Sequence, residues 1–243
     1  MTPSLLGGIG LTHLQVYHHR PDPDGRHTGC AHIHALTPEA YFGLHGEGAI
    51  ELHDPQNGFR SVPILPGTFV QFAPGTLHRS VSTDNLRVLA IMGNGGLPER
   101  GDARIYFGPE ADADEQEFER LKGLVRTGLE GALERRDVSA LAYRRLMRLW
   151  ETDKPAYRAE LVRFLDVHRR AIAGNRESFE EAVRTGPLAA GRAALAGLAA
   201  LAGPSAWGEG SDAASAVKWT SDRVGSVYGM CGILHQVENM GAA

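Results

Sequence analysis

The chain has 243 residues, of which 42% are hydrophobic and 22% charged, and a formal net charge of −4. This composition is typical of a globular protein and excludes wholesale disorder. Because there is no overall basic field, we expect neither nucleic acid nor a membrane surface as a partner. No stretch approaches the roughly 20 apolar residues that span a bilayer, and the N-terminal residues lack a cationic signal region. We therefore expect a cytoplasmic protein.

Residues 13–107 consist of short apolar and β-branched runs separated by Gly, Pro, Asn and Asp. Two of these breaks are strong turn signals. Asn57-Gly58 predicts a hairpin, and Pro66-Gly67 has the order of a type II turn. Many short strands at regular spacing indicate an antiparallel sandwich or barrel.

After Gly108 the periodicity becomes helical. Apolar residues recur every three or four positions in 114–137, 141–150 and 159–172, which predicts at least three amphipathic helices. The Ala-rich stretch 188–203 is compatible with a further, closely packed helix. Ser211 or Asp212 is a plausible N-cap for a last helical stretch over 215–236. The arginine and alanine bias of this half is typical of a GC-rich bacterial genome.

Two histidines stand one residue apart in "CAHIHALTPEAYFG", and a glutamate follows. Side chains alternate between the faces of a strand, so His32 and His34 project to the same side and can bind one metal ion together. A turn containing Pro38 then brings Glu39 to the start of the next strand, within reach of the same ion. His78, just after a Pro-Gly turn, supplies a fourth ligand.

Three imidazoles and one carboxylate suit a borderline divalent transition metal: Fe, Mn, Ni, Co, Cu or Zn. The two cysteines are far apart in sequence and form no CxxC pair, so a closed structural zinc site and a disulfide framework are not expected. The sequence does not distinguish among these metals.

The two segments 29–48 and 67–82 resemble the conserved motifs of the cupin superfamily, G-x5-HxH-x3,4-E-x6-G and G-x5-PxG-x2-H-x3-N. All four expected ligands are present at matching spacing. Three positions depart from the pattern without removing a ligand. Gly29 lies only two residues before the first histidine, Pro74 directly precedes Gly75, and Ser82 replaces the closing asparagine.

The resemblance covers about residues 10–107 and implies a small antiparallel jelly-roll β-barrel with the metal inside it. We accordingly expect a β plus α protein, with a cupin β-barrel domain at 1–110 and an all-helical extension of unknown role at 111–243. The resemblance also implies a homodimer.

Strand alternation extends the site beyond its ligands. Tyr41 and His45 share the parity of Glu39, so all three are candidates for catalytic roles if the strand is regular. Cys30 shares the face of the two histidines. The candidate substrate pocket is therefore formed by Cys30, Tyr41, Gln71 and Arg87, the last as a positive charge for an anionic substrate.

Within the cupins, such a site resembles that of dioxygenases acting on a small organic substrate. A second possibility is a non-redox isomerase, epimerase or lyase acting on a sugar or hydroxy acid, which needs a base near the metal: Glu39, Tyr41 or His45. A third is a small-molecule-binding protein without catalysis. Room beside the metal would favour an enzyme over this last alternative.

Overall fold

The structure, a computed structural model, describes residues 6–201, 217–220, 227–236 and 238–242. The strands are β1 (Gly10–Val16), β2 (His27–Thr28), β3 (His32–Ile33), β4 (Glu39–Asp54), β5 (Gly58–Ile64), β6 (Phe69–Phe72), β7 (Leu77–Met92), β8 (Arg104–Ile105), β9 (Val217–Thr220), β10 (Val227–Tyr228), β11 (Gly232–Gln236) and β12 (Glu238–Ala242). The α-helices are α1 (Pro109–Asp112), α2 (Glu115–Lys122), α3 (Leu129–Thr152), α4 (Lys154–Ile172), α5 (Arg176–Thr185) and α6 (Pro187–Ala200).

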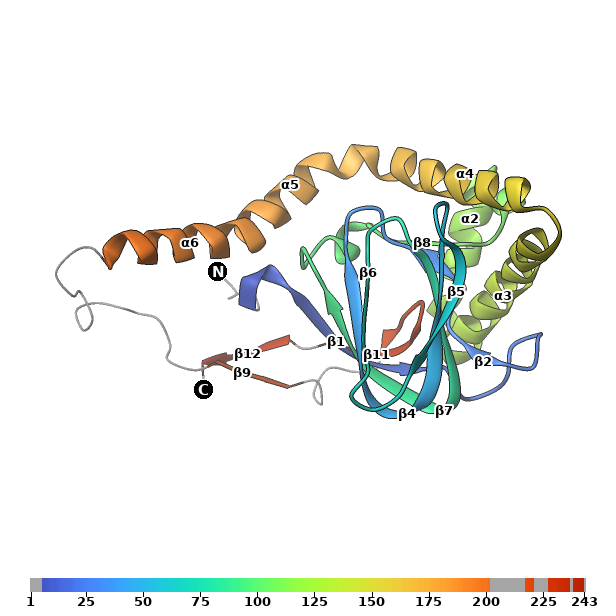
Figure 1. The fold of residues 1–243 in the computed structure, drawn as a ribbon, viewed down its shortest axis with the longest axis horizontal. Coiled ribbons are helices and arrows are strands. Elements are labelled where there is room, and N and C mark those ends of the chain that lie inside the picture. The colour runs from blue at the N-terminus through green and yellow to red at the C-terminus, as the bar shows by residue number, and fades with distance from the viewer. Residues whose placement is uncertain (1–5, 202–216, 221–226, 237, 243) are drawn as a thin grey trace.

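Ten strands form one antiparallel sheet, which curls around its own core (Figure 1). Its frame is the pair β4 and β7, two 16-residue strands that run together from Glu39 opposite Met92 to His53 opposite Leu77. The predicted Asn57-Gly58 hairpin joins β4 to β5, and the Asp54 carboxylate accepts hydrogen bonds from the backbone of its turn. β9 and β12 form a separate two-stranded sheet. The predicted fold class, β plus α, is confirmed.

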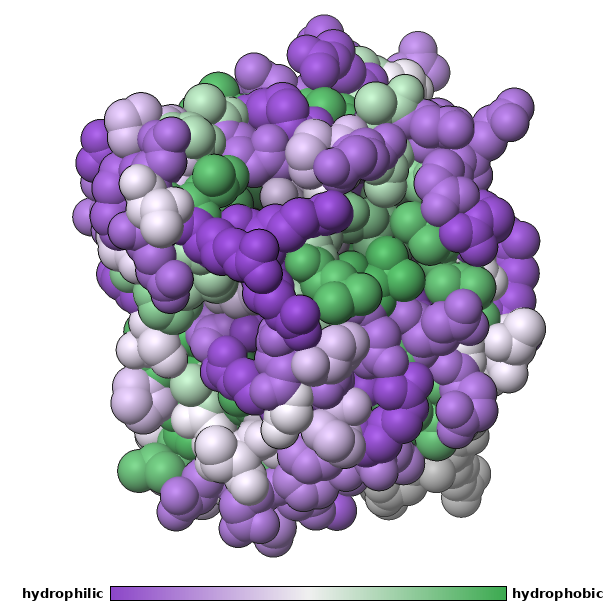
Figure 2. Space-filling view, turned by 90° about the vertical axis from the view of Figure 1, so that its right-hand side faces the viewer, coloured by the Kyte–Doolittle hydropathy of each residue, from purple (hydrophilic) through white to green (hydrophobic). Residues whose placement is uncertain are grey.

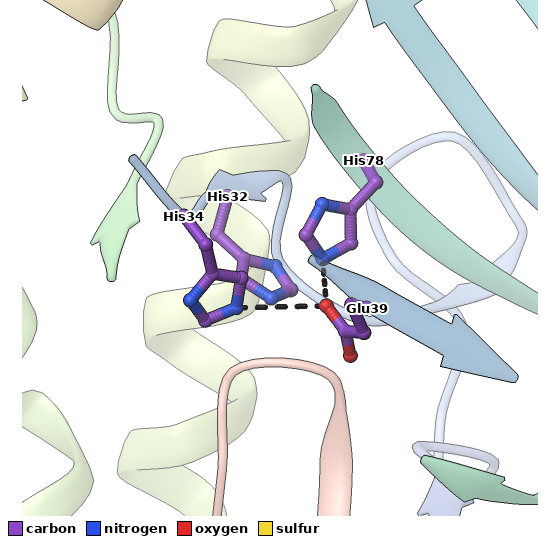
Figure 3. Close-up of side chains that lie close together, drawn as sticks. All are labelled: His32, His34, Glu39 and His78. Atoms are coloured by element: carbon purple, nitrogen blue, oxygen red, sulfur yellow. Dashed lines mark ion pairs between the residues drawn. The ribbon is translucent and has the colours of Figure 1, made fainter. Parts of the chain in front are cut away.

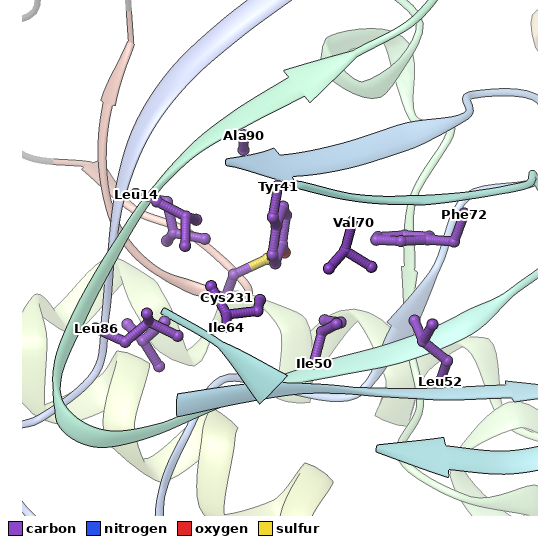
Figure 4. Close-up of a cluster of buried hydrophobic side chains, with 12 residues drawn as sticks. Leu14, Tyr41, Ile50, Leu52, Ile64, Val70, Phe72, Leu86, Ala90 and Cys231 are labelled. Carbon is purple, nitrogen blue, oxygen red and sulfur yellow. The ribbon is translucent and has the colours of Figure 1, made fainter. Parts of the chain in front are cut away.

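The inner face of the curled sheet is filled by apolar side chains from strands far apart in sequence (Figure 4). They include Leu14 of β1, Ile50 of β4 and Val88 of β7, each at most 1% exposed. The alternating apolar pattern of the strands places these side chains inside, since residues two apart share a face.

A second core lies between the outer face of the sheet and helices α3 and α4. It also contains polar groups. His53 of β4 is hydrogen-bonded through Nδ1 to the Tyr157 hydroxyl (2.8 Å) and through Nε2 to the Tyr143 hydroxyl (2.7 Å). Tyr143 donates to Glu51, so it accepts from His53, and His53 in turn accepts from Tyr157. This chain of hydrogen bonds ties both helices to the sheet.

The helical half begins differently from the prediction. The expected helix over 114–137 is interrupted: α2 ends at Lys122, a 3-10 turn spans Gly123–Thr127, and α3 begins only after Gly128. Gly128 has φ 87°, a value that breaks a right-handed helix. The face of the molecule around α2 and α3 is mostly hydrophilic and contains a hollow lined by hydrophobic side chains (Figure 2).

The last predicted helical stretch, over 215–236, is wrong. Residues 217–220, 227–228 and 232–236 are strands, so the described C-terminal region is not all-helical. β11 pairs with β1 from Gly232 opposite Val16 to Gln236 opposite Thr12, so the main sheet includes strands from both ends of the described chain. The suggested N-caps Ser211 and Asp212 lie outside the described residues. The domain division at residue 110 stays a prediction.

Among the described helices, none has the length and apolar character needed to cross a membrane.

Candidate metal centre

The four predicted ligands converge at one point inside the curled sheet (Figure 3). His32 lies on β3, His34 follows that strand, Glu39 begins β4 and His78 lies at the start of β7. Each is 4% exposed or less, and one ligand atom from each lies within 4.8 Å of all the others. Glu39 and His78 belong to opposite ends of the β4 and β7 ladder. Closure of the sheet therefore brings them together.

The three imidazoles are held in the same way, each through its Nδ1 atom. Nδ1 of His32 lies 3.0 Å from the Cys30 carbonyl oxygen, Nδ1 of His78 lies 3.0 Å from that of Thr76, and Nδ1 of His34 bonds to that of Asp102. A carbonyl can only accept, so each Nδ1 carries the proton and donates it. In the neutral ring, each Nε2 therefore carries a lone pair and no proton.

Two of those Nε2 atoms, on His34 and His78, face a carboxylate, and the third, on His32, lies 3.4 Å from Sγ of Cys231. Oε2 of Glu39 lies 3.1 Å from Nε2 of His78 and 3.6 Å from Nε2 of His34. Oε2 of Glu39 and Nε2 of His78 are both buried and have no hydrogen-bond partner among the described residues. Buried lone pairs that face one another without a donor are unfavourable. A divalent cation at their centre satisfies all of them, so the residues fit a metal.

Electrostatics keep the ligands in their metal-binding protonation states. Burial, together with the neighbouring histidines, lowers the pKa of His32 well below its usual value, and burial also lowers the pKa of His34. Burial alone would raise the pKa of Glu39, but a positive charge on His78 or His34 outweighs burial and lowers this pKa, so a cation at this point keeps the carboxylate ionised. Neutral imidazoles and an ionised carboxylate are the forms that coordinate metals.

Asp102 fixes the loop that carries His34 toward Glu39. Its carboxylate, fully buried, accepts hydrogen bonds from the backbone nitrogens of Ala35 and Leu36 and from the Thr37 hydroxyl. Its carbonyl orients the His34 ring. The sequence offered no signal for this role, because Asp102 lies 68 residues from His34. Partners of this kind hold metal ligands in place and tune their affinity.

A cavity of about 200 Å³ opens beside His32, His34 and Glu39. One of its walls comes from the C-terminal hairpin of β10 and β11, which contributes Cys231. The Sγ atom of Cys231 lies 3.4 Å from Nε2 of His32. Sequence reasoning missed this neighbour, because residues 215–236 were expected to be helical.

Two predicted pocket residues are buried close to the cavity without lining it. Tyr41 is fully buried. Its hydroxyl lies beside Cys231 (Figure 4) and donates to Sγ of that residue at 3.6 Å. The same hydroxyl accepts from the Ser80 hydroxyl at 3.4 Å. Cys30 is packed among apolar side chains near Phe107 and Phe118. Both residues therefore contact residues of the site from outside the cavity lining: Tyr41 contacts Cys231, and the carbonyl of Cys30 accepts from His32.

The inward placement of three other predicted residues is wrong. His45 is exposed, because the pairing of β4 with β7 shifts between Gly43 and His45 and the extra residue ends the regular alternation. Gln71 is exposed because its neighbours Val70 and Phe72 occupy the inner face. Arg87 is half-buried between Leu86 and Val88, which both face the core, so it points away from the cavity.

No family model and no curated protein matches the chain. Among solved structures, a putative sugar phosphate isomerase from Acidithiobacillus ferrooxidans is 26% identical over 35% of this chain and 49% of its own, with a TM-score of 0.27. A predicted oxalate decarboxylase from Thermotoga maritima is 30% identical over 30% of this chain and 57% of its own, with a TM-score of 0.24.

A DMSP lyase from Ruegeria pomeroyi is 24% identical over 27% of this chain and 31% of its own, with a TM-score of 0.23. The chain thus spans less than two thirds of each of these three proteins. With TM-scores this low, the partial matches carry no argument about what the chain does.

Proposed function

We propose that this chain is a cupin-type metalloenzyme that binds one divalent transition metal through His32, His34, Glu39 and His78 and adds oxygen to a small organic substrate. The observation that carries the metal site is the buried contact between Oε2 of Glu39 and Nε2 of His78, two acceptors without a donor among the described residues, within the cluster of four candidate ligands. The register of HxH, Glu and His in the two cupin-like motifs supports the same assignment.

A bound ion would polarise an oxygen donor of the substrate and, if redox-active, would also supply the electron chemistry that dioxygen requires. The residues of the chain contribute the geometry and the charge of the site. Carbonyl oxygens hold the three imidazoles in register, and Glu39 places one negative charge against the ion while leaving it net positive. The cavity beside His32 and His34 leaves room for substrate, which favours an enzyme over a closed binding protein.

The non-redox alternative requires a proton-accepting side chain at the cavity. Of the three candidates that the sequence offered, His45 is exposed on the outside of β4 and Tyr41 does not line the cavity. Glu39 remains, but in this proposal it is occupied as a ligand, and Glu99, the other carboxylate of the described lining, is exposed to solvent. The oxygen-adding reaction is therefore the better supported of the two.

The test is oxygen uptake by the full chain loaded with ferrous iron and offered a panel of small enols and phenols. The zinc-loaded chain is the control, since zinc has no redox chemistry. Uptake with iron and none with zinc is expected, together with its loss in His78→Ala and its retention in His45→Ala. Absence of uptake across the panel, or turnover with zinc and without oxygen, would reject the oxygen-adding reaction in favour of the lyase or isomerase.

A further inference from the structure

The cavity at the candidate metal centre differs in character from the ligand cluster beside it. The lining side chains that β1, β7 and the C-terminal hairpin contribute are mostly apolar: Leu14, Ala90, Met92, Met230 and Leu234. Thr12 and Cys231 add a hydroxyl and a thiol. Leucine and alanine give a hydrocarbon surface, and the two methionines give a soft, adaptable one.

The charged side chains in the described lining of this cavity are both acidic: Glu39 and Glu99, of which Glu99 is exposed. The described lining contains neither lysine nor arginine. Two arginines lie nearby without lining the cavity. Arg87 faces away, and Arg135, which keeps its charge, is held against the hairpin by hydrogen bonds to the carbonyl oxygens of Tyr228 and Gly229.

A phosphate or a carboxylate on the substrate would therefore enter a small cavity whose described lining offers it no cationic side chain, so that only the ion would contact it as a counter-charge. Leaving a charge buried and unpaired is costly, so such substrates are disfavoured. A sugar fits poorly for a related reason, because its many hydroxyls need hydrogen-bond partners that leucine, alanine and methionine side chains lack. A volume of about 200 Å³ is also below the range of typical drug-sized sites.

We infer that the site takes a small, uncharged molecule with an oxygen-donor head that reaches the metal and an apolar body that lies against Leu14, Ala90, Met92, Met230 and Leu234. This inference rests on the proposed function, since the head group requires the metal. It narrows the substrate class to neutral enols, phenols or ketones with little further polarity. It also excludes the anionic substrate for which Arg87 was considered.

The test holds the metal-binding head constant and changes only the far end of the molecule. The full chain is loaded with cobalt, whose visible spectrum reports binding, and titrated with butyrohydroxamic acid and with succinic monohydroxamic acid. These two chelators differ by a methyl group in one and a carboxylate in the other. The methyl compound is expected to bind at least about tenfold more tightly, because only the carboxylate loses hydration without gaining a partner.

A charge-reversal variant sharpens the comparison. Glu99→Arg places a cation at the cavity and is expected to narrow the preference for the methyl compound by about threefold or more. Glu47→Arg makes the same change on an exposed part of β4 outside the cavity lining and is expected to leave the preference unaltered. Equal effects of the two variants would count against the cavity as the binding site.

The outcomes separate this inference from the proposed function. Equal or tighter binding of the carboxylate compound overturns the substrate class while leaving the metal site in place. Cobalt binding with no spectral response to either compound overturns it as well, because the cavity is then not open to the ion. Failure to bind cobalt overturns the metal site and this inference together.

Discussion

The Sγ atom of Cys231 lies 3.4 Å from Nε2 of His32, although 199 residues separate them in the sequence. The contact exists because β11 pairs with β1 and the backbone nitrogen of Cys30 donates to the Met230 carbonyl. The C-terminal hairpin is thus a wall of the candidate metal centre, and several properties of the site depend on it.

The two cysteines should differ in reactivity. Cys231 lines the cavity, whereas Cys30 is completely buried among apolar side chains. A small uncharged reagent such as methyl methanethiosulfonate is expected to modify Cys231 and not Cys30. The reaction should be slow, because burial raises the pKa of the Cys231 thiol, and zinc should slow it further by occupying the site. Mass spectrometry measures the number of modified thiols. Cys30→Ser is expected to retain the modification and Cys231→Ser to lose it. Equal labelling of both thiols would contradict the placement of Cys231 in the wall of the cavity.

Gly29 should be required for docking of the hairpin. A Cβ atom on Gly29 would lie 2.7 Å from the Cα of Cys231, closer than real contacts allow. Gly29→Ala is expected to lower the free energy of unfolding by about 1–3 kcal/mol, as overpacking does. Gly174→Ala is the matched control, because a Cβ atom there would have no neighbour within 4 Å and the φ of Gly174 is not positive. Urea unfolding compares the two, and similar stabilities would refute the close approach.

Asp102 should influence metal affinity without touching the metal. In Asp102→Asn the side chain keeps one acceptor oxygen for three donors, so the loop from His34 to Glu39 loses part of its anchoring. Loss of such a partner typically weakens metal binding by about 10- to 100-fold. Calorimetric titration with zinc measures the change, and Asp84→Asn on the exposed surface provides the control. An unchanged zinc affinity in Asp102→Asn would show that Asp102 does not influence metal binding.

Acid should destabilise the fold through His53. Burial lowers the pKa of this histidine from 6.5 to about 3. The unfolded chain therefore takes up a proton on it below about pH 6.5 while the folded chain does not. Since the unfolded state binds more protons, the free energy of unfolding falls as the pH drops through this window, by about 1.4 kcal/mol per pH unit.

The variant that isolates this effect is His53→Gln, whose amide can still donate to Tyr143 and accept from Tyr157. Urea unfolding at about pH 6.5 and about pH 5 should show a loss smaller by roughly 2 kcal/mol in the variant than in the natural chain. The difference cancels the contribution of other buried histidines such as His168, whose pKa is lowered to about 4 by burial. Identical losses would show that His53 titrates normally.

The ligands could be predicted from the sequence because their signals are local. His32 and His34 are two residues apart on one strand face, Glu39 opens the next strand, and His78 follows a Pro-Gly turn. Each relation depends on strand alternation or turn chemistry over a few residues. The structure brings these four residues together as expected.

The surrounding pocket could not be predicted, for two physical reasons. A single extra residue between Gly43 and His45 reverses which face the following side chains occupy. The glycines of "YFGLHG" are compatible with such a bulge but do not fix its position. Cys231 and Asp102 reach the site through pairing and packing over long sequence separations. Such contacts depend on the whole topology and leave no short-range pattern.

The proposal that four buried side chains bind one metal ion is tested by the metal content of protein purified without an affinity-tag metal column and then equilibrated with zinc. We expect about one ion per chain in the natural protein and in His45→Ala, in which an exposed histidine of the same sheet is removed. For His78→Ala we expect a loss of at least about tenfold in affinity. Equal zinc binding by His78→Ala and His45→Ala, or none by the natural chain, would contradict it.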